Sequence, residues 1–303
     1  MSGVMRKENA CVLCPRRCGA DRSSGKAGVC GVSDIITVAR AALHYWEEPC
    51  ISGENGSGTV FFSGCALRCV FCQNREISRG EAGKRISEER LTEIFLELQE
   101  KKAHNINLVT PDHYCIQIGQ ALKKAKERGL RIPVVANTGG YLSPEQYDVL
   151  KEYTDIWLTD FKYMDSRLAA KYSGAADYPV VAKAALEKMV RDTGNPVYDD
   201  NGMLKKGVIV RVLLLPGYTE DARNIVSYLW DSYGESIIIS LMNQYTPPSE
   251  GLPDHPELMR TVTEEEYDEL VDYAVDLGIE DAYIQEGGTQ EESFIPPFDL
   301  EGV

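Results

Sequence analysis

Six short runs of mainly apolar, β-branched residues recur along the chain, at intervals that leave room for a helix between them. Near-continuous apolar runs of this length are typical of strands buried on both faces, as in a parallel sheet. The predicted strands cover residues 58–64, 105–111, 132–139, 155–162, 207–217 and 236–245.

Helical patterns with capping signals fill the intervals. Ser87 precedes apolar residues at helical spacing, Ser143 is followed by Gln146, and Thr263 forms a capping box with Glu266. This alternation predicts an α/β fold, either a full or partial β/α barrel or an open doubly wound sheet. In each of these folds a site lies at the carboxyl ends of the strands.

The same patterns divide the chain into three expected regions. Residues 1–50 do not join the alternation and contain C-V-L-C-P-R-R-C, which indicates an appended cysteine-rich extension. Residues 51–250 carry the six strands. Residues 251–303 are expected to hold a last helix, a strand and an ordered tail that close the barrel.

Composition and charge narrow the class of protein. The 303 residues are 43% apolar, which suits one large soluble core. A net charge of −15 disfavours binding to nucleic acid. The segment between Arg6 and Lys26 is locally basic, as expected of a solvated extension or of a docking site for an acidic electron carrier. No apolar run has the length of a membrane helix or a signal peptide, so a cytoplasmic location is expected.

The most informative motif is C-A-L-R-C-V-F-C at residues 65–72, directly after the first predicted strand and Gly64. The chain has nine cysteines, and clustered cysteines in a reducing compartment are better explained as metal or cluster ligands than as disulfides. A structural zinc site closes with four ligands, whereas Cys65, Cys69 and Cys72 supply three. An iron-sulfur cubane held by three thiolates leaves one iron open for a substrate or cofactor.

The motif resembles the cluster loop of radical S-adenosylmethionine (SAM) enzymes, with Phe71 as its aromatic residue. The resemblance implies a partial (β/α)6 TIM-type barrel, a 4Fe-4S cluster on Cys65, Cys69 and Cys72, and SAM on the open iron. It further implies reductive cleavage of SAM to a 5′-deoxyadenosyl radical that abstracts hydrogen from a substrate. An open cluster iron also implies oxygen sensitivity and an anaerobic setting.

Three later segments resemble the pyruvate formate-lyase activating enzyme-like family, in its PflX-type branch. T-D-F-K resembles the family's D-x-K strand and implies that Asp160 and Lys162 lie near SAM, with a monovalent cation beside it. V-A-N-T-G-G implies cofactor contacts from Asn137 and Thr138. R-V-L-L-L-P-G-Y-T-E-D matches the family's R-x-x-x-x-P-G-x-x-D. Arg211, in an apolar run, is expected to face the lumen with an anionic partner.

The resemblance to this family is less specific at the ends of two predicted strands. The last sheet strand resembles the family's SAM-ribose strand, with Asn243, Gln244 and Tyr245 as candidates. The second strand ends in L-V-T-P-D-H-Y instead of the family's Gly-Gly-Glu turn. Asp112 and His113 there suit either a substrate-facing acid and base or, at the start of a loop, a cap or a surface role.

Four further cysteines, Cys11, Cys14, Cys18 and Cys30, have C-x2-C-x3-C-x11-C spacing. Four thiols are the right number to close a zinc site or to hold a second iron-sulfur cluster, and the spacing does not separate the two.

Three functions are compatible with these motifs. The leading hypothesis is an activating enzyme that takes hydrogen from a glycine of a partner protein, a glycyl radical enzyme, with reduced flavodoxin or ferredoxin as electron donor. The second is the same radical chemistry on a small molecule or peptide. The third is a metal- or cluster-binding interaction protein without catalysis.

Overall fold

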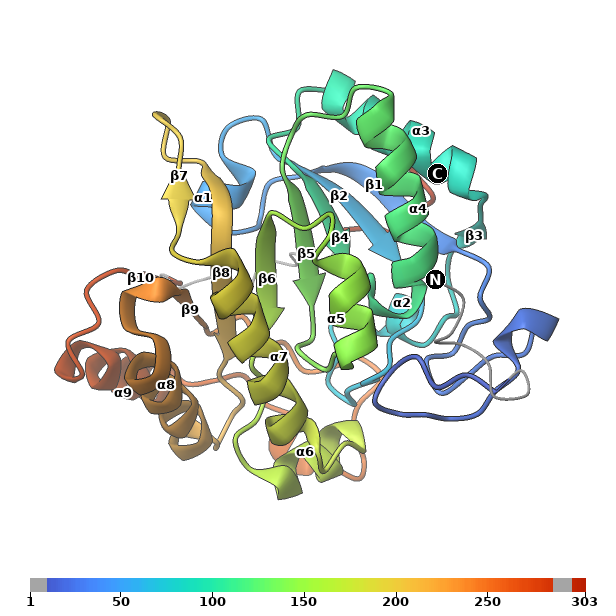
Figure 1. Ribbon diagram of the computed structural model, residues 1–303. Coiled ribbons are helices and arrows are strands. Elements are labelled where there is room, and N and C mark those ends of the chain that lie inside the picture. The colour runs from blue at the N-terminus through green and yellow to red at the C-terminus, as the bar shows by residue number, and fades with distance from the viewer. Residues whose placement is uncertain (1–9, 286–295) are drawn as a thin grey trace.

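The computed structural model describes residues 10–285 and 296–303 and is built around one curved sheet (Figure 1). The strands run in the order β10-β9-β8-β6-β5-β4-β2-β1-β3, and β7 pairs with β8 beside this path. Their bounds are β1 (Thr37–His44), β2 (Ser57–Phe62), β3 (Lys84–Arg85), β4 (Ile106–Val109), β5 (Val134–Thr138), β6 (Ile156–Asp160), β7 (Val197–Tyr198), β8 (Leu204–Leu213), β9 (Ile238–Met242) and β10 (Ala282–Ile284).

The strands β2, β4, β5, β6, β8, β9 and β10 are parallel, and each of them lies beside the one that precedes it in this order. This sequential order is that of a β/α barrel and differs from a doubly wound sheet, in which the order reverses. Within the described residues β10 and β3 do not pair, so the sheet stays open. The predicted partial barrel is confirmed, and β10 adds a seventh parallel strand to the six predicted ones.

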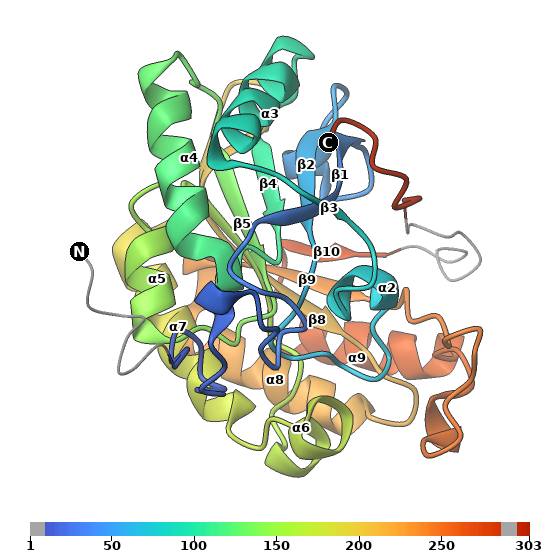
Figure 2. The same ribbon diagram turned by 90° about the vertical axis from the view of Figure 1, so that its right-hand side faces the viewer.

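The longer helices cover the outer side of the sheet (Figures 1 and 2). The helices of the described residues are α1 (Pro49–Ser52), α2 (Arg75–Ser78), α3 (Glu88–Glu100), α4 (Cys115–Glu127), α5 (Pro144–Leu150), α6 (Ser166–Ser173), α7 (Tyr178–Thr193), α8 (Thr219–Tyr233) and α9 (Glu264–Asp276). The predicted caps are confirmed: Ser87 accepts from the amide of Arg90, and Ser143 and Thr263 form complete capping boxes.

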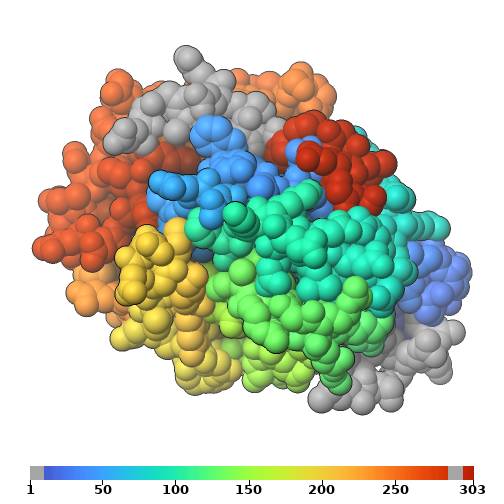
Figure 3. Space-filling model, turned by 90° about the horizontal axis from the view of Figure 1, so that it is seen from above, coloured from blue at the N-terminus to red at the C-terminus, as the bar shows by residue number. Residues whose placement is uncertain are grey.

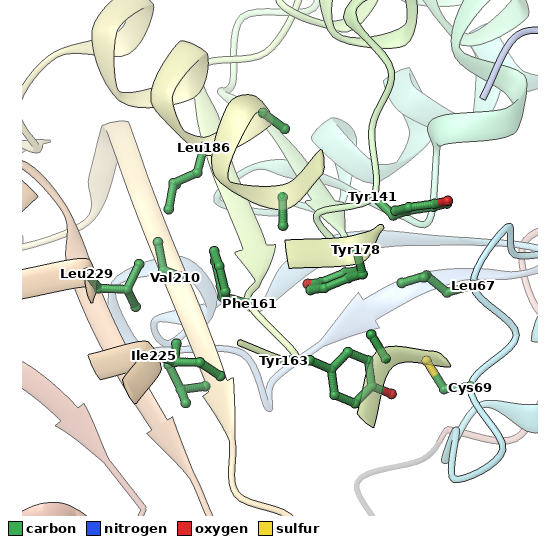
Figure 4. Packing of buried hydrophobic residues seen from close by; sticks show 14 of the residues in the cluster. Leu67, Cys69, Tyr141, Phe161, Tyr163, Tyr178, Leu186, Val210, Ile225 and Leu229 are labelled. Atoms are coloured by element: carbon green, nitrogen blue, oxygen red, sulfur yellow. The ribbon is translucent and has the colours of Figure 1, made fainter. Parts of the chain in front are cut away.

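The largest hydrophobic core lies between the sheet and α5 to α9, and reaches from Leu229 on α8 to Leu67 in the loop after β2 (Figure 4). Trp157 on β6 stacks on Tyr147 of α5, with ring centroids 5.3 Å apart. The core continues without a break to Cys69, so the loop that carries the three-cysteine motif packs directly on it.

The strand β1 falls in the region for which the sequence predicted no strand. It pairs antiparallel with β2 and so covers the edge of the parallel sheet. The last residues of the chain then cover β1: Arg40 forms ion pairs with Asp299 and Glu301, and the amide of Ala41 donates to the carbonyl of Glu301. Figure 3 shows this red C-terminal segment against the blue N-terminal part of the chain. Part of the predicted tail, residues 286–295, lies outside the described residues.

No helix in the described parts of the chain combines the length and the apolar character that crossing a membrane requires.

Candidate active site

A cavity opens at the carboxyl ends of the parallel strands, where the residues that follow β2, β4, β5, β6 and β9 meet. The nine residues named from the cluster motif and the strand ends all line it: Cys65, Cys69, Phe71, Cys72, Asn137, Thr138, Asp160, Lys162 and Arg211. The fold therefore brings together residues that are up to 146 positions apart in the chain (211 − 65). Their roles as ligands stay predictions.

The turn that presents the motif depends on Gly64. Its φ of +95° lies in the left-handed region that side chains disfavour. A Cβ atom at this position would lie 2.7 Å from a methyl carbon of Val32 and 2.9 Å from the carbonyl oxygen of Cys30. No side chain fits there, so glycine is required for the chain to turn from β2 into the cysteine loop.

The loop is held in place by the N-terminal segment. The amide of Cys65 donates a 3.0 Å hydrogen bond to the carbonyl of Cys30. The guanidinium of Arg16, between two cysteines of the N-terminal set, donates to the carbonyls of Ala66 at 2.8 Å and Leu67 at 3.3 Å. The same guanidinium reaches the carbonyls of Ser173 and Gly174 at the end of α6.

Arg22 also turns inward, so the basic N-terminal segment is not simply a solvated extension. Its side chain is 4% exposed and donates to the carbonyls of Ser33 at 2.6 Å and His113 at 3.0 Å. The guanidinium groups of Arg16, which is half-buried, and Arg22, which is buried, thus form their hydrogen bonds with backbone carbonyls of the protein itself.

His113 and Asp112 lie inside the protein, which rules out the surface role considered for them, and neither lines the cavity. The Nε2 atom of His113 lies 2.8 Å from the carbonyl oxygen of Ser63, which makes Nε2 the donor and helps to hold the start of the cysteine loop. Burial lowers the pKa of His113 to about 3 and raises that of Asp112 to about 7. His113 is therefore neutral and acts as a structural donor.

The three thiols of the motif interact with one another. Burial, followed by the neighbouring thiol of Cys69, raises the pKa of Cys65 to about 12, and the same causes raise that of Cys72. Cys69 is 6% exposed and accepts a 3.0 Å hydrogen bond from the hydroxyl of Ser173. Among the described residues, however, no three Cys, His, Asp or Glu side chains converge on one point as the ligands of a single metal ion do.

The cavity beside these thiols fits a polar cofactor. The side-chain oxygen of Asn74 is buried without a hydrogen-bond partner and lies on the cavity wall. Gly139, directly after β5, also lines the cavity, and a Cβ atom there would be 3.0 Å from Leu67 of the cysteine loop and 3.6 Å from Lys162. Three thiol donors and an unpaired amide oxygen along one cavity suit the cluster and SAM.

Asp160 and Lys162 form an ion pair at the end of β6, with 2.6 Å between the Lys162 ammonium and a carboxylate oxygen of Asp160. Burial opposes the charge of Lys162, but the Asp160 carboxylate, together with Cys69 and Tyr178, favours it, and the pKa of Lys162 is raised overall. The hydroxyl of Tyr178 accepts from the amide of Lys162 and bonds to the carbonyls of Gly139 and Asp160. This hydroxyl ties the ends of β5 and β6 together.

The anionic partner expected for Arg211 is confirmed, and it is a pair of residues that the sequence did not point to. Arg211 donates to Glu48 at 2.6 and 2.7 Å and also to Glu47, and the three side chains are 5–12% exposed. Asn107 donates to the other oxygen of Glu47 at 2.7 Å. Arg211 and Glu47 both line the cavity, and two carboxylates against one guanidinium leave a net negative charge there.

Residues at the ends of β4, β5 and β9 form the remaining wall of the cavity. The hydroxyl of Thr138 lies 3.2 Å from that of Thr159, so it is partly committed to the protein. Of the three candidates after β9, Gln244 and Tyr245 line the cavity and Asn243 does not. Thr110 also lines it, with a φ of +56° that is unusual for a β-branched residue. This strained turn stands where the family has its glycine-rich turn.

The second cysteine set is gathered in space but lies off the cavity. Burial raises the pKa of Cys14 to about 11, and the thiols of Cys30, Cys11 and Cys18 add to the effect. A Cβ atom on Gly28 would lie 3.2 Å from the sulfur of Cys18 and 3.6 Å from that of Cys30. The four cysteines therefore lie in one region next to Arg22, although here too their side chains do not converge on one point as the ligands of a metal ion do.

Comparison with known proteins identifies the class. Residues 59–229, more than half of the chain, match the family model of the radical SAM superfamily. The chain belongs to this superfamily, whose enzymes use a 4Fe-4S cluster and SAM. The match begins in β2 and covers the cysteine loop and the strand ends up to Arg211.

Individual relatives have low sequence identity to this chain. The uncharacterized protein MJ0674 of Methanocaldococcus jannaschii is 26% identical over 272 residues, which are 87% of this chain and 74% of that protein. The pyruvate formate-lyase-activating enzyme of Clostridium pasteurianum is 29% identical over 124 residues, 38% of this chain and 49% of that enzyme. The latter alignment therefore spans only about half of that enzyme.

Among solved structures, Streptococcus suis SuiB bound to its precursor peptide SuiA has a TM-score of 0.50 at 13% identity. The match covers 74% of this chain and 47% of SuiB. A domain of a pyruvate-formate lyase-activating enzyme from Bacteroides vulgatus aligns over 58% of this chain and 94% of that domain, at 17% identity and a TM-score of 0.41.

Proposed function

We propose that this radical SAM enzyme is of the activating type and takes a hydrogen atom from a glycine of a partner protein. The observation that carries the proposal is that three thiols of one eight-residue loop share a cavity wall with Asp160, Lys162 and Arg211. The partial alignment with the Clostridium pasteurianum activating enzyme supports the choice of reaction within the superfamily.

In this proposal Cys65, Cys69 and Cys72 hold the cluster, and Phe71 packs between Tyr163, Tyr172 and Tyr245 to keep water from it. When bound, the cluster supplies the electron that cleaves SAM, and SAM supplies the group that abstracts hydrogen.

The protein's own groups then orient SAM. The Lys162 ammonium and the Asp160 carboxylate form a polar pair of opposite charges at the cavity wall, which suits the amino and carboxylate groups of SAM. Asn137 and Thr138 approach from the end of β5, and Asp160 is also the candidate ligand for a monovalent cation beside SAM. Arg211 is neutralised by Glu47 and Glu48, so its main task is to hold the wall of the cavity.

The test is anaerobic reconstitution with iron and sulfide, followed by reduction with dithionite and an assay of SAM for 5′-deoxyadenosine. Replacing Cys65, Cys69 and Cys72 by Ala is expected to abolish cleavage, because the thiolates that hold the cluster are lost. Cys115→Ala is the matched control, since this buried thiol lies outside both cysteine sets. Cleavage that survives the triple replacement would refute the proposal.

A second measurement tests the substrate. Incubation of the reduced enzyme with SAM and pyruvate formate-lyase should produce the electron paramagnetic resonance (EPR) signal of a glycyl radical on that protein. Formation of 5′-deoxyadenosine without any glycyl radical would leave the radical SAM chemistry intact, and would favour a small molecule or peptide as substrate.

We also propose that Cys11, Cys14, Cys18 and Cys30 hold a metal centre, either a zinc ion or a second iron-sulfur cluster. Their mutual interaction and the buried guanidinium of Arg22 beside them support four thiolates at this point. Metal analysis of the reconstituted protein separates the two: about four irons with one zinc indicates the ion, and about eight irons indicates the cluster. Four irons without zinc would refute a metal at this position.

A further inference from the structure

Two hydroxyl groups form a series of hydrogen bonds that ends at one sulfur atom of the cysteine loop. Ser173, the last residue of α6, donates from its hydroxyl to the sulfur of Cys69 at 3.0 Å. The hydroxyl of Tyr163 lies 2.7 Å from the same serine oxygen. Figure 4 shows Tyr163 with its hydroxyl turned toward Cys69.

The direction of these hydrogen bonds follows from the number of protons. A serine hydroxyl has one proton, and a cysteine sulfur that binds a cluster can only accept, so in that state the proton of Ser173 is committed to Cys69. The Tyr163 hydroxyl must then donate to the Ser173 oxygen. Two hydroxyl groups in series polarise each other, which strengthens the bond that reaches the sulfur.

The three groups are shielded from solvent, with exposed fractions of 0% for Tyr163, 5% for Ser173 and 6% for Cys69. The end of α6 is fixed against the loop on both sides of the contact: the amide of Val70 donates to the carbonyl of Tyr172 at 2.9 Å, and Arg16 binds the carbonyls of Ser173 and Gly174. The serine hydroxyl is thus held in place, and water has no access to replace it.

We propose that Tyr163 and Ser173 form a hydroxyl relay that raises the reduction potential of the cluster by hydrogen bonding to its ligand Cys69. The inference rests on the proposed function in that it takes Cys69 as a cluster ligand. Reduction adds one negative charge to the cluster and its thiolates. A donor aimed at a ligand sulfur stabilises the more negative state, so the potential rises. Tyr163 and Ser173 are positioning and tuning residues that do not touch the substrate.

The test is a redox titration of the reconstituted protein, with the cluster identified as the one whose EPR signal changes when SAM is added. Ser173→Ala is expected to shift the potential to lower values. Tyr163→Phe is expected to shift it in the same direction by a smaller amount, because the serine keeps its bond but loses the donor behind it. A double variant that matches Ser173→Ala alone shows that Tyr163 acts through Ser173 and not through its own interaction with Cys69.

The chain offers a matched control. The hydroxyls of Ser227 on α8 and Tyr273 on α9 lie 2.6 Å apart, and neither residue lines the cavity. Ser227→Ala and Tyr273→Phe remove the same chemical groups from a similar pair and are expected to leave the potential unchanged.

Potentials equal to that of the unmodified protein in both Ser173→Ala and Tyr163→Phe, at full iron content, would overturn the relay. Additive shifts in the double variant would overturn its serial arrangement. If the Ser173→Ala variant does not bind a cluster, the Tyr163→Phe variant provides the test, because this substitution removes only a single oxygen atom. An unmodified protein that assembles no SAM-responsive cluster would instead refute the proposed function, and the relay with it.

Discussion

The amide of Cys65 and the carbonyl of Cys30 are joined by a hydrogen bond of 3.0 Å. The two cysteine sets, one at the cavity and one outside it, therefore meet at a single backbone contact. Together with Arg16, this contact makes the N-terminal segment a structural support of the cluster loop.

Arg16→Ala is expected to loosen the cluster loop, because the guanidinium links the carbonyls of Ala66 and Leu67 to the end of α6. Each bond from a charged donor contributes about 1.5–3 kcal/mol, so we expect a loss of about 2 kcal/mol or more in unfolding free energy, with a lower iron content after reconstitution. Arg17→Ala, an exposed neighbour, is the control. Equal iron content and stability in both variants would show that the clamp has no role.

Gly64→Ala is expected to prevent correct folding of the cysteine loop. The positive φ costs about 1–3 kcal/mol for a residue with a side chain, and the new Cβ atom would clash with Val32 and the Cys30 carbonyl. Gly129→Ala separates the two effects, because Gly129 has a φ of +109° and no atom within 4 Å of the added Cβ. Thermal unfolding and iron binding should suffer more in Gly64→Ala; similar losses would assign the effect to φ alone.

Arg211→Met is expected to lower the free energy of unfolding by about 3–5 kcal/mol, because it leaves Glu47 and Glu48 buried without their cation. Adding Glu47→Gln and Glu48→Gln should restore part of the loss, since the uncompensated charges are then removed. Arg223→Met breaks an exposed ion pair with Glu269 and should cost about 0–1 kcal/mol. Urea titrations of the three variants provide the comparison.

The buried carboxyl group of Asp112 contributes a pH-dependent term to stability. Burial raises its pKa from the usual 3.8 to about 7 in the folded protein, so the folded state holds the proton more tightly. The contribution of Asp112 to the free energy of unfolding is therefore greatest below about pH 4 and falls as the pH rises to 7, by about 1.4 kcal/mol for each unit of pKa difference. Asp112→Asn removes this penalty, and its advantage over the unmodified protein should grow from pH 4 to pH 7.

The control for this titration is Asp272→Asn, on the exposed face of α9. Its effect on the urea midpoint, measured over the same pH range, is the reference for removing a carboxyl group at the surface. An advantage of Asp112→Asn that stays constant with pH would show that the carboxyl group is not protonated in the folded state.

Prediction from sequence succeeded where the local pattern of residues is enough to determine the structure. The strands β2 and β4 are buried at every residue, so their apolar runs identify them without further information. The strand β1 was missed because T-V-A-R-A-A-L-H mixes partly buried and buried positions without a regular period, and its pairing with β2 and the C-terminal segment decides its conformation. Glu47 and Glu48 were missed for a related reason, since nothing near them in sequence indicates a partner 163 residues away.

By itself the sequence determined the order of β and α elements, the three-cysteine loop and the need of Arg211 for an anion, because periodicity, ligand spacing and the cost of a buried charge are local properties. The tertiary structure decided which groups meet: Arg16 with the cluster loop, Ser173 and Tyr163 with Cys69, and Arg211 with its two glutamates. These contacts join segments far apart in the chain. They exist because parallel strands bring their carboxyl ends to one edge, where the loops between them pack together.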